Sequence, residues 1–131
     1  MILYKNLLKR PMAHILIVDD EEGLRALCAT YLQRRGYAVK TCADGEDAWV
    51  ELSSASLPYD LLITDNAMPR LDGAELIERI RAAKMPIRIL SISGSQVPEH
   101  SRPIVPDVDG VVPKPFTIQA LGAAVRAQLG G

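Results

Sequence analysis

The chain has 131 residues, a formal net charge of -1 and 48% hydrophobic residues. This length predicts one domain with an ordinary hydrophobic core. The balanced charge gives no general attraction to nucleic acid, and no apolar run is long enough to span a membrane, so we expect neither as a partner. Cys28 and Cys42 lack metal-ligand spacing and are expected to be structural. A cytoplasmic location is the default expectation.

The first twelve residues mix basic and apolar side chains. Their longest apolar stretch after the start, Leu7-Leu8, is too short for a signal-peptide core. We interpret residues 1–12 as an extension, with Met12 as a possible alternative start, and residues 13–131 as the domain. A short helix that docks on the domain or on a partner is the alternative interpretation.

The first half of the domain alternates apolar runs with amphipathic patterns. The run His14–Val18 predicts a strand covered on both faces, and the acids at 19–22 that follow it can cap a helix. The apolar residues of that helix recur at helical spacing: Leu24, Leu27, Cys28, Tyr31 and Leu32. Gly36 ends the helix, residues 37–41 predict a second strand, and Asp44-Gly45 begins the next helix.

The second half continues the alternation. Strands are expected at 61–65, 87–92 and 110–112, a helix at 72–83, and a last helix capped by Thr117. Residues 95–109 break the pattern with three prolines, and an interior proline costs a helix about 3 kcal/mol, so at most one helical turn is expected there. The order of elements predicts a parallel sheet with helices on both faces and right-handed crossovers.

Polar side chains stand where the predicted strands end: Asp19 and Asp20, then Asp65, Ser93 and Lys114. The carboxyl ends of parallel strands share one edge of the sheet, where binding sites form. Three carboxylates there repel each other, and Mg²⁺ resolves that conflict with oxygen ligands. A lysine and a serine can contact phosphoryl oxygens, and a carboxylate can act as the nucleophile. The set therefore predicts phosphoryl transfer.

This ordered set resembles the response-regulator receiver domain of bacterial two-component systems, of the chemotaxis-regulator type. The resemblance covers residues 13 to about 129 and rests on four motifs: Ile15 to Asp20 with Glu21, Asp65 with Met68-Pro69 and Asp72-Gly73, Ser93-Gly94, and Lys114-Pro115-Phe116. It implies a flavodoxin-like α/β fold with a five-stranded parallel sheet in the order 2-1-3-4-5. In this chain we expect the fourth helix to be shortened or missing.

The resemblance also implies a role for each site residue. Asp65 would be the phosphoacceptor, and Mg²⁺ would be held by Asp19, Asp20, Asp65 and the backbone carbonyl of Ala67. Ser93 would take the place of the family's switch Ser/Thr, and Lys114 would contact the phosphoryl group across a cis Lys114-Pro115 bond.

The function expected from this resemblance is that of a single-domain response regulator. It would accept a phosphoryl group from a histidine kinase or a histidine phosphotransfer protein and signal by contact with a downstream protein target, as a monomer. It would be no enzyme beyond its own phosphorylation and dephosphorylation. A receiver-shaped adaptor that acts without phosphorylation is the alternative. A dehalogenase-like phosphatase would need a second acid where Ala67 stands.

Three features depart from the family's usual pattern. Val111 stands where an aromatic residue usually swings inward, Ala67 offers no polar side chain to guide a water, and residues 95–109 replace the fourth helix. We therefore expect the readout to use Ser93 and the 95–109 loop, by ordering or movement of that loop.

Overall fold

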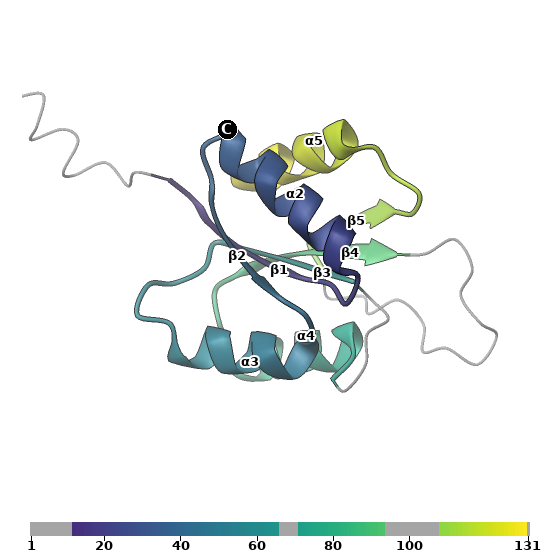
Figure 1. Ribbon diagram of the computed structural model, residues 1–131. Coiled ribbons are helices and arrows are strands. Elements are labelled where there is room, and N and C mark those ends of the chain that lie inside the picture. The colour runs from purple at the N-terminus through teal and green to yellow at the C-terminus, as the bar shows by residue number, and fades with distance from the viewer. Residues whose placement is uncertain (1–11, 66–70, 94–107, 131) are drawn as a thin grey trace, which may run out of the picture.

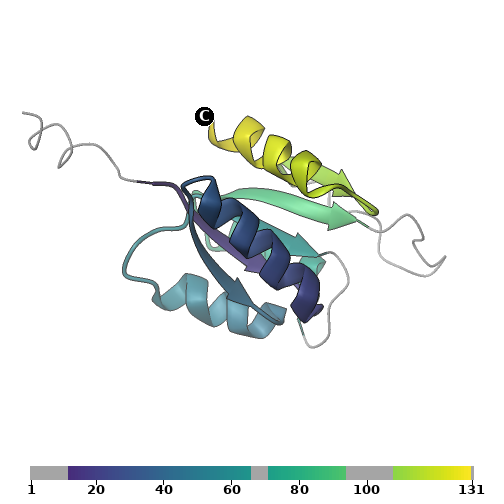
Figure 2. The same cartoon turned by 45° about the horizontal axis from the view of Figure 1, so that its top comes forward.

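The computed structural model describes residues 12–65, 71–93 and 108–130. Its sheet contains five parallel strands in the order β2-β1-β3-β4-β5, which confirms the expected order. The strands are β1 (His14–Val18), β2 (Ala38–Cys42), β3 (Leu61–Asp65), β4 (Arg88–Ser93) and β5 (Gly110–Pro113). All five run in one direction, so their carboxyl ends meet at one edge of the sheet (Figure 2).

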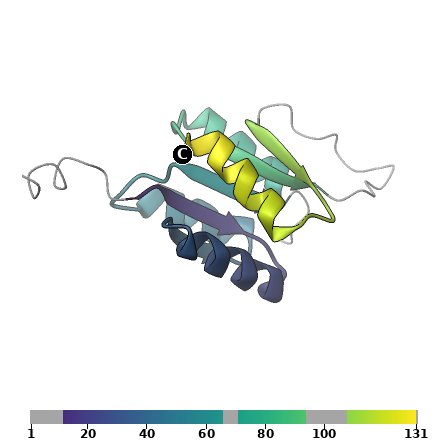
Figure 3. The ribbon, with the colours of Figure 1, turned by 90° about the horizontal axis from the view of Figure 1, so that it is seen from above.

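Two layers of helices cover the sheet. The described helices are α2 (Glu22–Arg34), α3 (Gly45–Ser54), α4 (Gly73–Ala82) and α5 (Ile118–Leu129). Helices α2 and α5 lie over one face, and α3 and α4 lie over the other (Figure 1), an arrangement also visible from above (Figure 3). The shortened fourth helix expected between β4 and β5 falls on residues 94–107, outside the described residues.

Each face of the sheet has its own hydrophobic core, one under α2 and α5 and one under α3 and α4. Strands β1 and β3 contribute to both, since alternate residues of a strand point to opposite faces. Ile15 and Ile17 join the first core, whereas Leu16 and Val18 join the second. This double burial explains why these strands are continuously apolar in the sequence.

Three of the four described helices begin with a side-chain cap. Asp44, Asp72 and Thr117 each accept a hydrogen bond from the backbone N–H three residues further on. Helix α2 differs, because Glu21 at its N-cap position makes no side-chain cap hydrogen bond. The expected capping of α2 is therefore wrong for Glu21, whose own N–H donates to Asp19 Oδ1 at 2.8 Å.

The predicted apolar face of α2 is wrong at one position. Leu27 is 57% exposed, although Cys28 and Leu32 on the same helix are buried. The buried stripe is centred on Cys28, Ala29 and Leu32, so Leu27 lies on its flank and outside the first core. The helical spacing alone does not show which edge of an apolar stripe reaches the core.

The two leucine environments lead to a stability prediction. Leu76 of α4 is fully buried, and we expect Leu76→Ala to lower the free energy of unfolding by about 2–5 kcal/mol, through lost burial and a cavity. Leu27→Ala should change it by about 0.5 kcal/mol or less. Urea denaturation followed by circular dichroism measures both, and equal losses would contradict the assignment of the core.

Cys28 should make stability depend on pH. Burial raises the pKa of its thiol from 9.0 to about 11. Between these values the unfolded chain ionises Cys28 and the folded chain does not, so the free energy of unfolding falls as pH rises from 9 toward 11. In urea titrations, we expect the free energy of unfolding of the original chain, relative to that of Cys28→Ala, to fall between pH 8 and pH 10. A difference that stays constant over this range would contradict the prediction.

Candidate functional site

The strand register gathers the polar strand ends at one place. Val18 of β1 pairs with Thr64 of β3, so the residues that follow them, Asp19 and Asp65, lie side by side at the carboxyl edge. On the other side of β3, Asp65 pairs with Ile92, the neighbour of Ser93. Ser93 pairs with Pro113 of β5, which directly precedes Lys114. Three neighbouring strand pairs thus bring separated parts of the sequence to one site.

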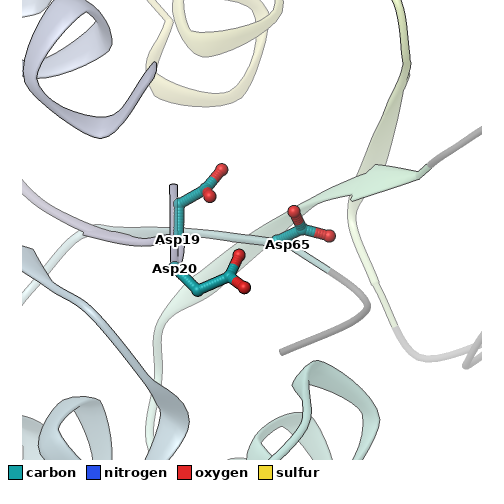
Figure 4. Close-up of side chains that lie close together, drawn as sticks. All are labelled: Asp19, Asp20 and Asp65. Atoms are coloured by element: carbon teal, nitrogen blue, oxygen red, sulfur yellow. The ribbon is translucent and has the colours of Figure 1, made fainter. Parts of the chain in front are cut away.

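Three carboxylates form the acidic side of this site (Figure 4). Asp19, Asp20 and Asp65 each offer a carboxylate oxygen, and these oxygens all lie within 4.8 Å of one another. Asp19 and Asp65 are buried, with 2% and 6% of their surface exposed, whereas Asp20 is exposed. A group of this kind concentrates negative charge where little water can screen it.

Lys114 supplies the opposing charge. Its Nζ lies 2.7 Å from Asp65 Oδ2 and donates a hydrogen bond to it. The backbone N–H of Lys114 donates to the Ser93 carbonyl at 2.7 Å, which continues the pairing of β5 with β4. The Lys114-Pro115 peptide bond is cis, as expected.

These neighbours shift the proton affinities of two site residues. Burial raises the pKa of Asp19 above its usual value, and the charge of Asp65 adds to this rise, while the hydrogen bond from the Glu21 N–H and the charge of Lys114 oppose it. Burial lowers the pKa of Lys114, but the hydrogen bond to Asp65 and the charges of Asp65 and Asp19 outweigh it and leave the pKa raised. Lys114 is therefore a cation at neutral pH.

The loop that presents the acid pair is fixed by backbone contacts. The Asp19 N–H donates to the Cys42 carbonyl at 3.2 Å, and the Asp19 carbonyl accepts from Arg25 Nη1 at 2.7 Å. The sequence analysis did not identify Arg25 as a site residue. A basic residue near the start of a helix is unfavourable because the helix dipole is positive there. Arg25 at this position therefore indicates that its side chain has a local partner, here the Asp19 carbonyl.

The structure describes only one of the two other expected site residues. Ser93 is buried at the carboxyl end of β4, the strand that pairs directly with the strand of Asp65. Ala67, whose carbonyl was expected to bind the metal, lies outside the described residues, as does most of the 95–109 loop. Val111, at the position where the family usually has an aromatic residue, is 44% exposed on β5.

The side chains present fit a hard divalent cation. Every donor in the cluster is a carboxylate oxygen, and Mg²⁺ prefers oxygen ligands and needs only one or two carboxylates from the protein. The raised pKa of Asp19 shows that its anionic form is disfavoured without an added positive charge. Asp19, Asp20 and Asp65 could therefore hold such an ion at this edge.

Within the described segments, each helix is too short or too polar to cross a lipid bilayer.

Comparisons with known proteins agree with the geometry. The sequence model of the response regulator receiver domain matches residues 15–126. The response regulator MprA of Mycolicibacterium vanbaalenii is 35% identical over 117 residues, which are 88% of this chain and 49% of MprA. The sensor kinase CckA of Brucella abortus is 30% identical over 118 residues, which are 89% of this chain and 12% of the kinase. The chain spans half or less of the length of these two relatives.

A solved structure extends the comparison to three dimensions. The response regulator protein TrrA from Thermotoga maritima, determined in complex with Mg²⁺ and BeF, superposes with a TM-score of 0.75 at 33% identity. The superposition covers 89% of this chain and 99% of that one. Sequence and fold thus agree over nearly the whole domain, and the chain belongs to the family of response regulator receiver domains.

Proposed function

We propose that this receiver domain is a phosphorylation-controlled switch in which Asp65 accepts the phosphoryl group. The observation that carries the proposal is the environment of Asp65: a buried carboxylate at a strand end, bonded to the Lys114 ammonium and adjacent to two further carboxylates. A lone structural aspartate would need only the ion pair. The additional acids match the charge requirements of phosphoryl transfer.

The transfer itself is a displacement at phosphorus. A carboxylate oxygen of Asp65 attacks the phosphorus of a phosphohistidine donor, the new O–P bond forms as the P–N bond breaks, and the electron pair returns to the imidazole nitrogen. Lys114 stabilises the charge on the transferred oxygens, and the Ser93 hydroxyl donates a hydrogen bond to one of them. When bound, Mg²⁺ supplies positive charge that offsets the acids; Asp19, Asp20, Asp65 and the Ala67 carbonyl would hold it.

The proposed partners follow from this chemistry. A histidine kinase or a histidine phosphotransfer protein would supply the phosphoryl group, and a downstream protein would read the phosphorylated state. The identity of the relatives as a response regulator and a sensor kinase supports this proposal. A monomeric state, a cytoplasmic location and action without an attached effector domain stay predictions.

Asp65→Asn should abolish labelling by acetyl phosphate in the presence of Mg²⁺, because an amide cannot act as the nucleophile. Mass spectrometry of the intact protein measures the added phosphoryl group. Asp60→Asn is the matched control, since Asp60 precedes the same strand at its other end and should leave labelling unchanged. Full labelling of Asp65→Asn would move the phosphoacceptor elsewhere, and an unlabelled original chain would favour the adaptor that acts without phosphorylation.

Lys114→Ala should change metal binding and phosphorylation in opposite directions. Removal of the ammonium leaves the carboxylates without their nearby cation, so Mg²⁺ affinity should rise in calorimetric titrations. Labelling should slow by roughly tenfold or more, because charge on the transferred oxygens is no longer stabilised. Asp20→Asn should instead weaken Mg²⁺ binding by about tenfold or more. If Lys114→Ala binds Mg²⁺ unchanged, the ion does not occupy this acid cluster.

A further inference from the structure

An apolar pocket lies at the opposite edge of the sheet from Asp65. It has a volume of about 130 Å³ and is formed by the last turn of α3, the connection to β3 and the segment before β4. Its lining includes Leu52, Ala55, Leu57, Tyr59, Met85 and Ile87. Leu57 is 67% exposed at this pocket.

The size and chemistry of the pocket restrict what it can hold. Small-molecule sites usually measure roughly 300–1,000 Å³, so a pocket of about 130 Å³ is too small for a metabolite. A cavity of about 150 Å³ accepts a benzene ring, which is the size of one apolar side chain. The hydroxyl of Tyr59 already donates to Glu51 at 2.6 Å. The pocket is therefore suited to an apolar side chain of a polypeptide.

The described chain enters the sheet beside this pocket. His14, the first residue of β1, stacks its ring on Tyr59 with 3.8 Å between ring centroids, and its backbone N–H donates to Asp60 Oδ2 at 2.7 Å. Residues 1–11 lie outside the described residues and are joined through Met12 and Ala13 to His14, which contacts the pocket residue Tyr59. Eleven residues can reach up to about 36 Å, and such a short tether gives an effective concentration in the millimolar range.

The composition of this segment matches the pocket and its surroundings. The segment contains the leucine pair Leu7-Leu8 followed by Lys9 and Arg10, and it has no acidic residue. Helix α3 ends at the pocket with no basic residue in its last turn, so its terminal carbonyls lack a cationic neighbour from that turn. The C-terminal end of a helix attracts cations. The leucine pair of the segment therefore matches the apolar pocket, and the two basic residues match the C-terminal end of α3.

We infer that residues 1–11 dock on this pocket, with a leucine of the Leu7-Leu8 pair inserted beside Leu57 and Met85. Lys9 and Arg10 then lie near the C-terminal end of α3. The docked segment covers the amino edge of the sheet and is independent of the phosphorylation site at the carboxyl edge.

The test uses the methyl resonance of Met85 in the full chain, labelled with ¹³C at the methionine methyl groups. The double variant Leu7→Ser/Leu8→Ser should shift this resonance, and Leu57→Ser in the pocket should abolish the response to the double variant. Leu27→Ser is the matched control, because Leu27 is also an exposed leucine but lies on the opposite face of the sheet. It should leave the Met85 resonance in place.

Three results would overturn the inference. One is a Met85 resonance that does not change when both leucines of the segment are replaced. Another is a resonance that moves with protein concentration in the original chain, which would mean that a second copy fills the pocket. The third is a Met85 resonance that still shifts when Leu7 and Leu8 are replaced in a chain that also carries Leu57→Ser. Acetyl phosphate labelling of the same samples tests the proposed function separately, since the docking variants should retain full labelling.

Discussion

The structure depends on how buried negative charge is compensated at the carboxyl edge of the sheet. Asp19 and Asp65 are almost fully enclosed, and their carboxylates face each other and Asp20. Without a countercharge, such an arrangement would drive one acid to take up a proton. Lys114 contributes one positive charge through its contact with Asp65. Three acids and one lysine still leave an excess of negative charge, which a divalent cation could offset.

Parallel pairing makes this charge arrangement possible. Antiparallel strands would send successive strand ends to opposite edges, whereas here β1, β3, β4 and β5 deliver their terminal residues to the same edge. The apolar runs of β1 and β3 are covered by a core on each face, so the acids follow strands that are buried on both faces. The hydrogen bond from Arg25 to the Asp19 carbonyl then fixes the loop between β1 and α2.

Most of this arrangement could be predicted from the sequence, for identifiable reasons. The continuous apolar runs and the glycine and proline positions predict the succession of strands and helices along the chain, and the residue types at the strand ends suggest the site. The order of the strands within the sheet was implied by the family resemblance. Contacts that depend on orientation could not be predicted. Leu27 fits the helical period but faces solvent, Glu21 stands at an N-cap position without capping, and Arg25 acts through a backbone carbonyl. Each of these depends on how α2 and the loop before it are placed in three dimensions, which no local pattern encodes.

The position of Lys114 has a consequence for how the domain can respond to a change in charge. The lysine follows β5, a strand of four residues that pairs with β4, lies at the edge of the sheet formed by the described strands, and ends in a proline without an N–H. The acids, in contrast, are borne by interior strands. A change in the charge of Asp65 would therefore act, through its contact with Lys114, on the end of an edge strand and not only on the interior strands.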